Sequence, residues 1–313
     1  MEKRRRIGAY GVARDETGRV LLVRSSPRSN NPGRWALPGG GLDHGEDPNV
    51  GVVREFREET GLEVAIAGLH DVFSDVVEFP WRGVQLHHDR IIFDVKVVGG
   101  ELLAETDGTT DLPAWIAEAD LPNLNLNPFV AKVLGVSKAE LGDDERPVRP
   151  DENNEVGVKG QALSGEKRVT RFGAYGVVTD ASGRVLLSLV SQGYPSGGNW
   201  HLPGGGTDFG EQPAEGLLRE IYEETGQSGE VTGLIRVGAR HNPAAMGPEG
   251  EPWDWYTVRA VFQVHIPEPS EPRVTEEAGG STADARWFTR TELTSIKLSD
   301  LARRELLHID LPG

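Results

Sequence analysis

The sequence predicts an α/β protein made of two similar α/β/α sandwich domains, each built around a mixed β-sheet. The first reason is an internal repeat: the stretch from Gly8 to Leu62 returns 165 residues later without a net gap, so that Gly40 returns as Gly205. The second is the length of one repeat, about 130 residues, which suits a domain and exceeds a solenoid unit. The third is that each copy mixes strand hairpins with helices, which argues against a purely parallel sheet.

The strands are predicted from apolar and β-branched runs between turn signals. Residues 7–13 and 19–24 are expected to form a hairpin around the turn at 15–18, and residues 172–178 and 184–189 repeat it. Further strands are expected over residues 90–95 and 259–264, and at Trp115–Ile116 and Trp287–Phe288. Because both copies carry the same series, we expect two similar domains of the kind that gene duplication produces.

One helix in each copy follows a glycine-rich loop. Asp47 is a suitable N-cap, Pro48 suits the first helical position, and Gly61 supplies a C-terminal stop. Pro213 and Gly226 take the last two positions in the second copy. Helical spacing gives each helix an apolar stripe, formed by Val52, Val53 and Phe56 in one copy and by Leu217, Leu218 and Ile221 in the other. These stripes indicate helices that pack on a core.

The expected domain boundaries follow from the repeat and from the segment between its copies. Residues 1–134 form the first predicted domain, residues 135–168 a linker, and residues 169–313 the second domain. The linker is polar, shows no sustained hydrophobic period and contains few large apolar residues, which is typical of a flexible connector. A short helix over residues 127–134 is expected to close the first domain.

The formal net charge of −16 and the absence of cysteine exclude several classes of protein. A negative chain repels long nucleic acid, whereas a small anionic substrate stays compatible because a bound metal inverts the local charge. Without cysteine there are no disulfides, thiolate zinc sites, iron–sulfur clusters or cysteine nucleophiles. No apolar run approaches the ~20 residues of a membrane span, and no signal-peptide stretch follows the basic N-terminus, so a cytoplasmic protein without membrane partners is expected.

Each copy carries a carboxylate-rich motif behind its glycine loop. In the first copy, Gly40 is followed after five residues by Glu46 and, after seven more, by Arg54. Three glutamates come next at helical spacing, namely Glu55, Glu58 and Glu59. They share one helix face, where like charges repel one another. The same positions in the second copy are Gly205, Glu211, Arg219, Glu220, Glu223 and Glu224.

A solvated acidic helix face is the ordinary explanation of such a triplet. That explanation does not require the same glycine loop and outlying glutamate to return with the triplet in both copies. Hard carboxylate ligands instead suit Mg²⁺ or Mn²⁺. Because Mg²⁺ takes few protein carboxylates and fills its shell with water and substrate phosphates, the expected substrate is a phosphate ester or anhydride. The glycine loop fits this role, since its backbone can approach a metal or a phosphate closely.

Both motifs resemble the Nudix box, Gly-x5-Glu-x7-Arg-Glu-U-x-Glu-Glu-x-Gly-U, in which U is a bulky apolar residue. The chain is similar to two Nudix (MutT-like) hydrolase domains in tandem, and the hairpin, glycine loop and late tryptophan strand extend the resemblance over most of each domain. Gln227 departs from the pattern, since the family places an apolar residue there, and weaker packing at the helix exit is expected. The resemblance implies Mg²⁺-dependent pyrophosphohydrolase activity on a nucleoside diphosphate linked to another moiety, such as a nucleoside triphosphate, an oxidised one or ADP-ribose.

The resemblance also implies a role for the motif residues. Glu58 and Glu59, with the carbonyl of Gly40, would hold the metal. Glu55 would add a ligand or activate water, and Arg54 would orient the carboxylates. The corresponding residues of the second copy are Glu223, Glu224, Gly205, Glu220 and Arg219. The chemistry agrees, since metals spread the charge of an attacked phosphate and a nearby carboxylate accepts the proton of the attacking water.

Further carboxylates are implied outside the triplet. Glu46 and Glu211 would assist near the start of each helix. Many family members also use one carboxylate from a later loop, for which Glu105 is the candidate in the first copy and Glu276 or Glu277 in the second. The alternative for these later residues is an ordinary surface acid.

Two matched arginines and several histidines complete the candidates. Arg90 and Arg259 occupy the same strand position in the two copies, where each either grips phosphate or forms a structural salt bridge. His201 aligns with an alanine, so the scheme does not require it. His87 and His88 have no counterpart, and exposed or edge-strand positions are expected for them.

Specificity in the family lies in loops outside the box. Residues 79–81 and 242–256 contain aromatic side chains that either stack on a base or pack beneath a loop. Pro243 lies sixteen residues after the second box, a spacing suggestive of ADP-ribose hydrolases, whereas the first copy lacks this proline.

Three alternatives stay open. One is a Nudix-fold nucleotide-binding or sensor protein with one or both sites catalytically silent, although complete carboxylate sets in both copies argue against it. Another is an isoprenoid diphosphate isomerase, a Nudix relative expected to need a cysteine that this chain lacks. The third gives one copy a structural role, with the two halves paired as an internal pseudo-dimer.

Overall fold

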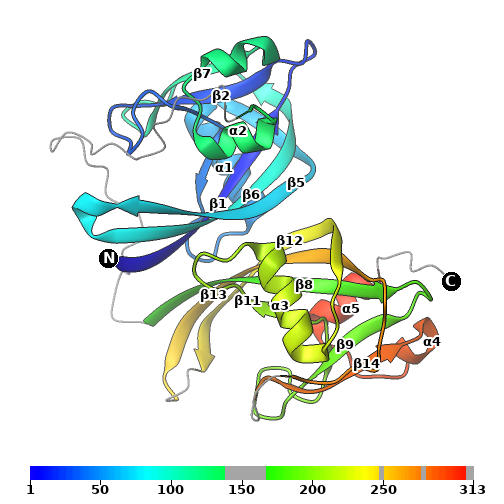
Figure 1. Cartoon of the computed structure of the whole chain (residues 1–313). Coiled ribbons are helices and arrows are strands. Elements are labelled where there is room, and N and C mark those ends of the chain that lie inside the picture. The colour runs from blue at the N-terminus through cyan, green and yellow to red at the C-terminus, as the bar shows by residue number, and fades with distance from the viewer. Residues whose placement is uncertain (138–166, 247–249, 276–279, 308–313) are drawn as a thin grey trace. The chain divides into compact units, whose positions relative to one another are not determined.

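The computed structural model describes residues 1–137, 167–246, 250–275 and 280–307. It divides into two compact units, which Figure 1 shows. Unit 1 comprises Met1–Thr170 together with Gly238–Val258, and unit 2 comprises Arg171–Val237 together with Arg259–Gly313. Among the helices in the described ranges, none is long and apolar enough to cross a membrane. Most of the predicted linker, residues 138–166, lies outside the described residues.

The main sheet of unit 1 is mixed, as predicted. Its order is β4-β1-β6-β5, with β1 parallel to β6 and antiparallel to β4, and β5 antiparallel to β6. These strands are β1 (Glu2–Ala13), β4 (Gly39–Gly41), β5 (Leu62–Phe79) and β6 (Val84–Gly100). A second sheet of order β3-β2-β7 contains β2 (Val20–Ser25), β3 (Trp35–Ala36) and β7 (Thr110–Ile116). Figure 1 shows β5 and β6 as a long hairpin alongside β1.

Helices cover both faces of the main sheet because side chains alternate along β1. Tyr10 and Val12 enter a core that includes Phe129 of the second helix. Gly11 faces the other way, since a Cβ at this position would lie 2.4 Å from Phe56 Cε2 of the first helix. The apolar stripe around Phe56 therefore fixes which side of this helix meets the sheet. The helical elements are α1 (Pro48–Thr60), α2 (Pro128–Leu134) and the short 3-10 turns η1 (Pro80–Arg82) and η2 (Glu118–Asn123).

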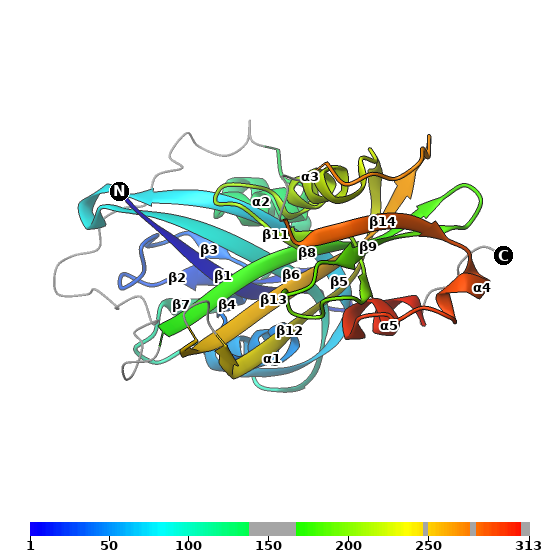
Figure 2. The ribbon, with the colours of Figure 1, turned by 90° about the horizontal axis from the view of Figure 1, so that it is seen from below.

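The second repeat contains a corresponding series of elements, but its strands form a single sheet. Its sheet has the order β10-β9-β8-β13-β12, with β11 beside β8 and β14 beside β9, and Figure 2 shows β8, β13 and β12 running side by side. Val177 enters a core with Leu301, whereas Gly176 faces Ile221 on the other side of β8. The elements are β8 (Lys167–Asp180), β9 (Val185–Val190), β10 (Trp200–His201), β11 (Gly204–Gly206), α3 (Pro213–Thr225), β12 (Glu230–Met246), β13 (Pro252–Ile266), β14 (Thr282–Phe288), α4 (Arg290–Leu293) and α5 (Asp300–Leu306).

The compact units depart from the sequence repeat in one segment. Strands β12 and β13 belong to the second repeat, but residues 238–258, which include the end of β12 and the start of β13, group with unit 1. There the N–H of Ala239 donates to Asp47 Oδ2 at 3.4 Å. The hydroxyl of Tyr256 donates to the carbonyl oxygen of Glu46. The start of α1 is therefore hydrogen-bonded to a segment far away in the sequence.

The predicted helix caps are confirmed. The side chain of Asp47 accepts the N–H of Asn49 at 2.9 Å, which satisfies one of the free donors at the start of α1. Gly61 ends the helix with a φ of 69°, in the left-handed region that favours glycine. Gly226 ends α3 in the same way with a φ of 68°. Both motif helices therefore begin and end where the sequence pattern places them.

The prediction for the histidine pair is wrong. His87 and His88 are buried in β6, which lies between β1 and β5 and is not an edge strand. His87 Nε2 lies 3.2 Å from Asp89 Oδ1, and His88 Nε2 lies 3.4 Å from the hydroxyl of Tyr10. Burial lowers the pKa of His88 well below its ordinary value. Polar partners on the same sheet thus allow two histidines to occupy a position that residue type alone argues against.

Candidate active sites

In unit 1 one arginine of α1 joins three carboxylates of the motif. Arg54 Nε and Nη2 each donate to Glu46 at 2.8 Å, in a forked ion pair. Its Nη1 donates to Glu55 at 2.8 Å and to Glu58 at 3.2 Å. A guanidinium carries its donors in one rigid plane, so a single arginine can fix the relative positions of several carboxylates. The positive charge of Arg54, which lies on the same helix, thereby reduces the repulsion expected within the acidic triplet.

Glu55 lies directly over the glycine strand β4. A Cβ at Gly40 would lie 2.7 Å from both Cδ and Oε2 of Glu55, so the carboxylate occupies the space that any side chain at position 40 would need. Burial raises the pKa of Glu55, while Arg54 beside it opposes this shift. Because Gly40 has no side chain, the carboxylate of Glu55 can lie against the backbone of the loop.

Glu59 is the most deeply buried member of the set, with 6% of its surface exposed. Its Oε2 accepts the N–H of Gly39 at 2.9 Å. Burial raises the pKa of Glu59 well above its ordinary value, against that hydrogen bond, and the nearby charges of Glu55 and Glu105 raise it further. A buried carboxylate beside other carboxylates is a group that a divalent cation would stabilise in its charged form.

Unit 2 reproduces the arginine-centred arrangement. Arg219 donates to the two oxygens of Glu211 at 2.8 and 3.1 Å. It also donates to Glu220 and to Glu223, each at 3.0 Å. A Cβ at Gly205 would lie 2.8 Å from Glu220 Cδ. The two motifs are thus alike in three dimensions and not only in spacing.

The buried carboxylate of unit 2 has partners that the sequence did not predict. Glu224 Oε2 accepts the N–H of Gly204 at 3.0 Å. The hydroxyls of Ser188 and Thr282 also donate to Glu224, each at 2.9 Å. Burial raises the pKa of Glu224 to about 8 even though all three hydrogen bonds lower it. The available sequence signal was the serine itself, which interrupts the apolar run of β9.

Of the carboxylates predicted in a later loop of each copy, the structure describes only Glu105. Thr110 donates to Glu105 Oε2 through its N–H at 3.2 Å and its hydroxyl at 3.0 Å. The charge of Glu105 is also among the causes that raise the pKa of Glu59. The counterparts predicted for the second copy, Glu276 and Glu277, lie outside the described residues.

The two matched arginines differ in their surroundings. Arg90 donates to Asp75 through Nε at 3.0 Å and Nη2 at 3.2 Å, and to the hydroxyl of Tyr10 at 3.1 Å. Arg259 lies 5.6 Å from the ring centre of Tyr175, and its Nε is buried without a hydrogen-bond partner among the described residues. The salt-bridge alternative therefore applies to Arg90, whereas Arg259 keeps donor capacity for an anion.

The expectation of weaker packing at Gln227 is wrong. Only 2% of this residue is exposed, and its side-chain amide pairs with Ser270: Nε2 donates to the hydroxyl and Oε1 accepts the N–H, each at 2.9 Å. The polar side chain of Gln227 can occupy a position where the family places an apolar residue, because Ser270 satisfies its hydrogen bonds.

We expect Gln227→Ala to lower the free energy of unfolding by about 1–3 kcal/mol, because two groups of Ser270 lose their partner. Urea denaturation measures the change. Gln85→Ala is the control, since the amide of Gln85 pairs with Glu78 at an exposed position, and it should change stability by less than about 0.5 kcal/mol. Equal losses in the two variants would contradict this account.

His201 adds a pH dependence to unit 2. Its Nδ1 accepts the N–H of Leu202 at 2.9 Å, which requires that nitrogen to be unprotonated. Burial, and then the charge of Arg259, lowers the pKa of His201 to about 4. The folded pKa is below the unfolded value of about 6.5, so the folded state binds fewer protons between these values. Stability is therefore complete above about pH 6.5 and is lost as the pH falls toward about 4.

We expect this loss to reach at most about 3 kcal/mol, and we expect His201→Ala to remove it, because the first copy carries Ala36 at this position. Denaturation at pH 7 and at pH 4.5 tests the difference. His70→Ala is the control, since His70 lies in an exposed pair with Asp94. An unchanged pH dependence in His201→Ala would show that other groups cause acid unfolding.

The residues of both motifs fit a divalent metal. Each set consists of hard oxygen donors, and each includes one carboxylate in the space left by a glycine, next to the backbone of the loop. Such donors suit Mg²⁺ or Mn²⁺. In unit 1 the residues that would hold the ion are Glu55, Glu58 and Glu59 with the carbonyl of Gly40, and in unit 2 Glu220, Glu223 and Glu224 with that of Gly205.

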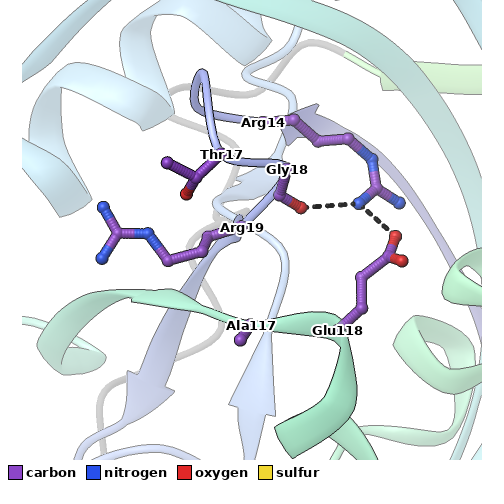
Figure 3. A pocket seen from close by; sticks show the side chains of 6 residues that line it. All are labelled: Arg14, Thr17, Gly18, Arg19, Ala117 and Glu118. Carbon is purple, nitrogen blue, oxygen red and sulfur yellow. Dashed lines mark hydrogen bonds and ion pairs between the residues drawn. The ribbon is translucent and has the colours of Figure 1, made fainter.

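A hollow in unit 1 shares no residue with the motif. It lies at the turn between β1 and β2 and is lined by Arg14, Thr17, Gly18, Arg19, Ala117 and Glu118 (Figure 3). Its central guanidinium, Arg14, donates to Glu118 at 2.6 Å and to the carbonyl of Gly18 at 3.2 Å. Because the charge of Arg14 is already paired, the hollow is not a candidate active site.

Comparison with known proteins gives one family in both halves of the chain. The family model described as NUDIX domain matches residues 4–134 and 169–308. An ADP-ribose pyrophosphatase of Methanocaldococcus jannaschii is 37% identical over 119 residues, which are 37% of this chain and 62% of that protein. This chain therefore spans less than two thirds of that relative.

Two further similarities are to a second curated relative and to a solved structure. A putative 8-oxo-dGTP diphosphatase of Bacillus subtilis is 30% identical over 115 residues, covering 37% of this chain and 68% of that protein. The crystal structure of a MutT protein from Methanosarcina mazei Go1 matches 43% of this chain and 94% of its own, with 25% identity and a TM-score of 0.36.

Proposed function

The chain belongs to the NUDIX family in both of its halves, and on this basis we propose that it is a Mg²⁺-dependent pyrophosphohydrolase. Its substrate is a nucleoside diphosphate linked to another moiety, and the bond cleaved is the diphosphate anhydride. Mn²⁺ is the expected substitute, because it accepts the same oxygen ligands. The proposal includes a cytoplasmic location, a small nucleotide as substrate and no long nucleic acid as partner.

One observation carries the proposal: each unit holds three carboxylates around one arginine and a fourth, buried carboxylate on a glycine N–H. The arginines are Arg54 and Arg219, and the buried carboxylates are Glu59 and Glu224. An arrangement that serves only solubility does not require a buried acid with a raised pKa in both units.

In this proposal the chain's own residues have distinct tasks. Glu55 and Glu220, which lie over the glycine strands, accept the proton of the attacking water or add a metal ligand. A bound Mg²⁺ would spread the negative charge of the attacked phosphate and lower the pKa of bound water. Arg54 and Arg219 are positioning residues, since each holds two or more of the carboxylates in place.

The two units differ in what they offer to the rest of the substrate. Arg259 retains a buried Nε that can donate to a phosphate oxygen, whereas Arg90 is paired with Asp75. Glu105 is the candidate for a further acid in unit 1, while its counterparts in the second copy lie outside the described residues. We therefore propose that the two units differ in substrate preference or rate.

The names of the relatives suggest two substrate classes to test first, ADP-ribose and oxidised nucleoside triphosphates. Pro243 gives little help in choosing between them. It is exposed and belongs to the segment grouped with unit 1, so its spacing from the second motif does not place it beside the carboxylates of unit 2.

The test is a Mg²⁺-dependent hydrolysis screen of the full chain over nucleoside triphosphates, oxidised nucleotides, nucleotide sugars, ADP-ribose and dinucleoside polyphosphates. Detection of pyrophosphate, orthophosphate or nucleoside monophosphate identifies the anhydride that is cut. We expect activity that disappears with EDTA and returns with Mg²⁺ or Mn²⁺. Tight nucleotide binding without turnover of any member would instead support a sensor protein.

A further inference from the structure

A second cluster of metal-ligating side chains lies in unit 1. It contains none of the motif carboxylates, although His44 stands between Gly40 and Glu46 in the sequence. His44 precedes α1, while His241 is on β12 and Asp254 is on β13. One candidate ligand atom from each residue lies within 4.8 Å of the other two. Asp254 Oδ1 is 3.1 Å from His44 Nε2 and 2.6 Å from His241 Nε2. Both imidazoles therefore face the same carboxylate oxygen.

The ring of His44 is oriented as a metal ligand would be. Its Nε2 is buried and has no hydrogen-bond partner among the described residues, although Asp254 is close. Its other nitrogen, Nδ1, lies 3.2 Å from the hydroxyl of Thr170. A proton on Nδ1 that is donated to this hydroxyl leaves the lone pair on Nε2, which is the tautomer that binds a metal.

The carboxylate is held from its far side. Arg168 Nε lies 3.2 Å from Asp254 Oδ2, so this oxygen has a cationic partner while Oδ1 faces the two rings. The side chain of Asp254 is 9% exposed and that of His44 is 15% exposed, whereas that of His241 is 35% exposed. Asp254 and His44 are thus largely buried, and His241 is the member most exposed to solvent.

We propose that His44, His241 and Asp254 bind one Zn²⁺ ion. Two imidazole nitrogens and one carboxylate oxygen suit Zn²⁺, with water in the fourth position on the open side. Bonds of 2.0–2.2 Å in a tetrahedron place ligand atoms about 3.3 Å apart, which these side chains reach by small rotations. The carboxylates of the motif are chemically different, because they offer only oxygen donors and suit Mg²⁺.

The position of this site gives it a structural role. Residues 238–258 already contact the start of α1 through Ala239 and Tyr256. A bound Zn²⁺ would join the same segment to His44, two residues before Glu46 of the motif. Since a ligand that binds only the folded state stabilises it, the melting temperature should rise with Zn²⁺ concentration.

The experiment is calorimetric titration of the full chain with Zn²⁺ in excess Mg²⁺, which saturates the carboxylate motifs. Wild type is compared with His44→Ala, His241→Ala and Asp254→Asn. His70→Ala is the matched control, because His70 and Asp94 form a histidine–aspartate pair at 3.0 Å that no third metal-ligating side chain joins among the described residues. We expect one tight Zn²⁺ per chain in wild type and in the control, and its loss in the other three variants.

X-ray absorption of the Zn²⁺-loaded chain identifies the ligands, since the carboxylate sets offer only oxygen donors and cannot supply two imidazoles. Circular dichroism without metal checks that the variants fold. If one does not, Thr170→Ala replaces it, with an affinity expected to be about 10–100-fold weaker. Zn²⁺ binding that is absent in wild type, unchanged in all these variants or free of imidazole would overturn the proposal.

Discussion

Replacing Glu55 and Glu220 by glutamine in one chain is expected to lower Mg²⁺-dependent hydrolysis by about 10²–10⁴-fold. Glutamine keeps the size of the side chain and one oxygen that can accept from Arg54 or Arg219. It removes the negative charge that would attract the metal or accept the proton of water. Measurement of kcat/KM on the best substrate of the screen, with wild type and double variant side by side, gives the size of the effect.

The single variants separate the two units. Glu55→Gln should remove the contribution of unit 1 and Glu220→Gln that of unit 2, so that the two residual activities add up to that of wild type. Glu215→Gln is the control, because Glu215 is exposed in the first turn of the same helix as Glu220 and takes no part in the arginine-centred set. Full activity in the double variant would show that neither Glu55 nor Glu220 takes part in the hydrolysis.

The sequence predicted those parts of the molecule that depend on local spacing. The caps at Asp47 and Gly61, the paired helices and the glycine strands all follow from residues within a few positions of one another. The sandwich followed as well, because alternation along β1 and the stripe on α1 each determine a buried face. The repeat made these patterns reliable, since each appears twice.

The rest depends on contacts between residues that are distant in the sequence. Polar residue type alone did not show that His87 and His88 lie on a central strand, because their partners Asp89 and Tyr10 become neighbours only after the sheet forms. Gln227 is similar, since Ser270 meets it from a distant segment. No spacing rule finds such pairs in a single sequence.

The same reasoning explains what the sequence left open around the motif. Ser188 and Thr282 lie on β9 and β14, which pair with each other. Their hydroxyls both reach Glu224 only because of the register between these two strands. The grouping of residues 238–258 with unit 1 contradicts no local pattern: of the strands β12 and β13, only residues 259–264 in β13 were expected from the sequence, and β12 was not. The grouping depends on contacts with residues near the start of α1, which are distant in the sequence.

The second large effect concerns the glycines beneath Glu55 and Glu220, the carboxylates that we propose to be catalytic. Gly205→Ala, made in the Glu55→Gln chain so that only unit 2 acts, is expected to lower kcat/KM by about 10²-fold. The added Cβ would lie 2.8 Å from Cδ and Oε2 of Glu220, which forces the carboxylate to move. The fold should persist, because the group displaced is the end of a flexible side chain and the φ of Gly205 is not in the left-handed region.

The neighbouring glycine is the decisive control. Gly206 lies in the same strand β11, yet a Cβ there meets no atom within 4 Å. Gly206→Ala should therefore retain the activity of its parent chain, and the melting temperatures of both alanine variants should be similar. In unit 1, Gly40→Ala in the Glu220→Gln chain repeats the test, with Gly68→Ala as its open-space control. Each pair adds the same methyl group to a strand. A selective loss at Gly205 and Gly40 would therefore support a role for the site that these glycines and the carboxylates above them form, and equal activity within the pairs would refute that role.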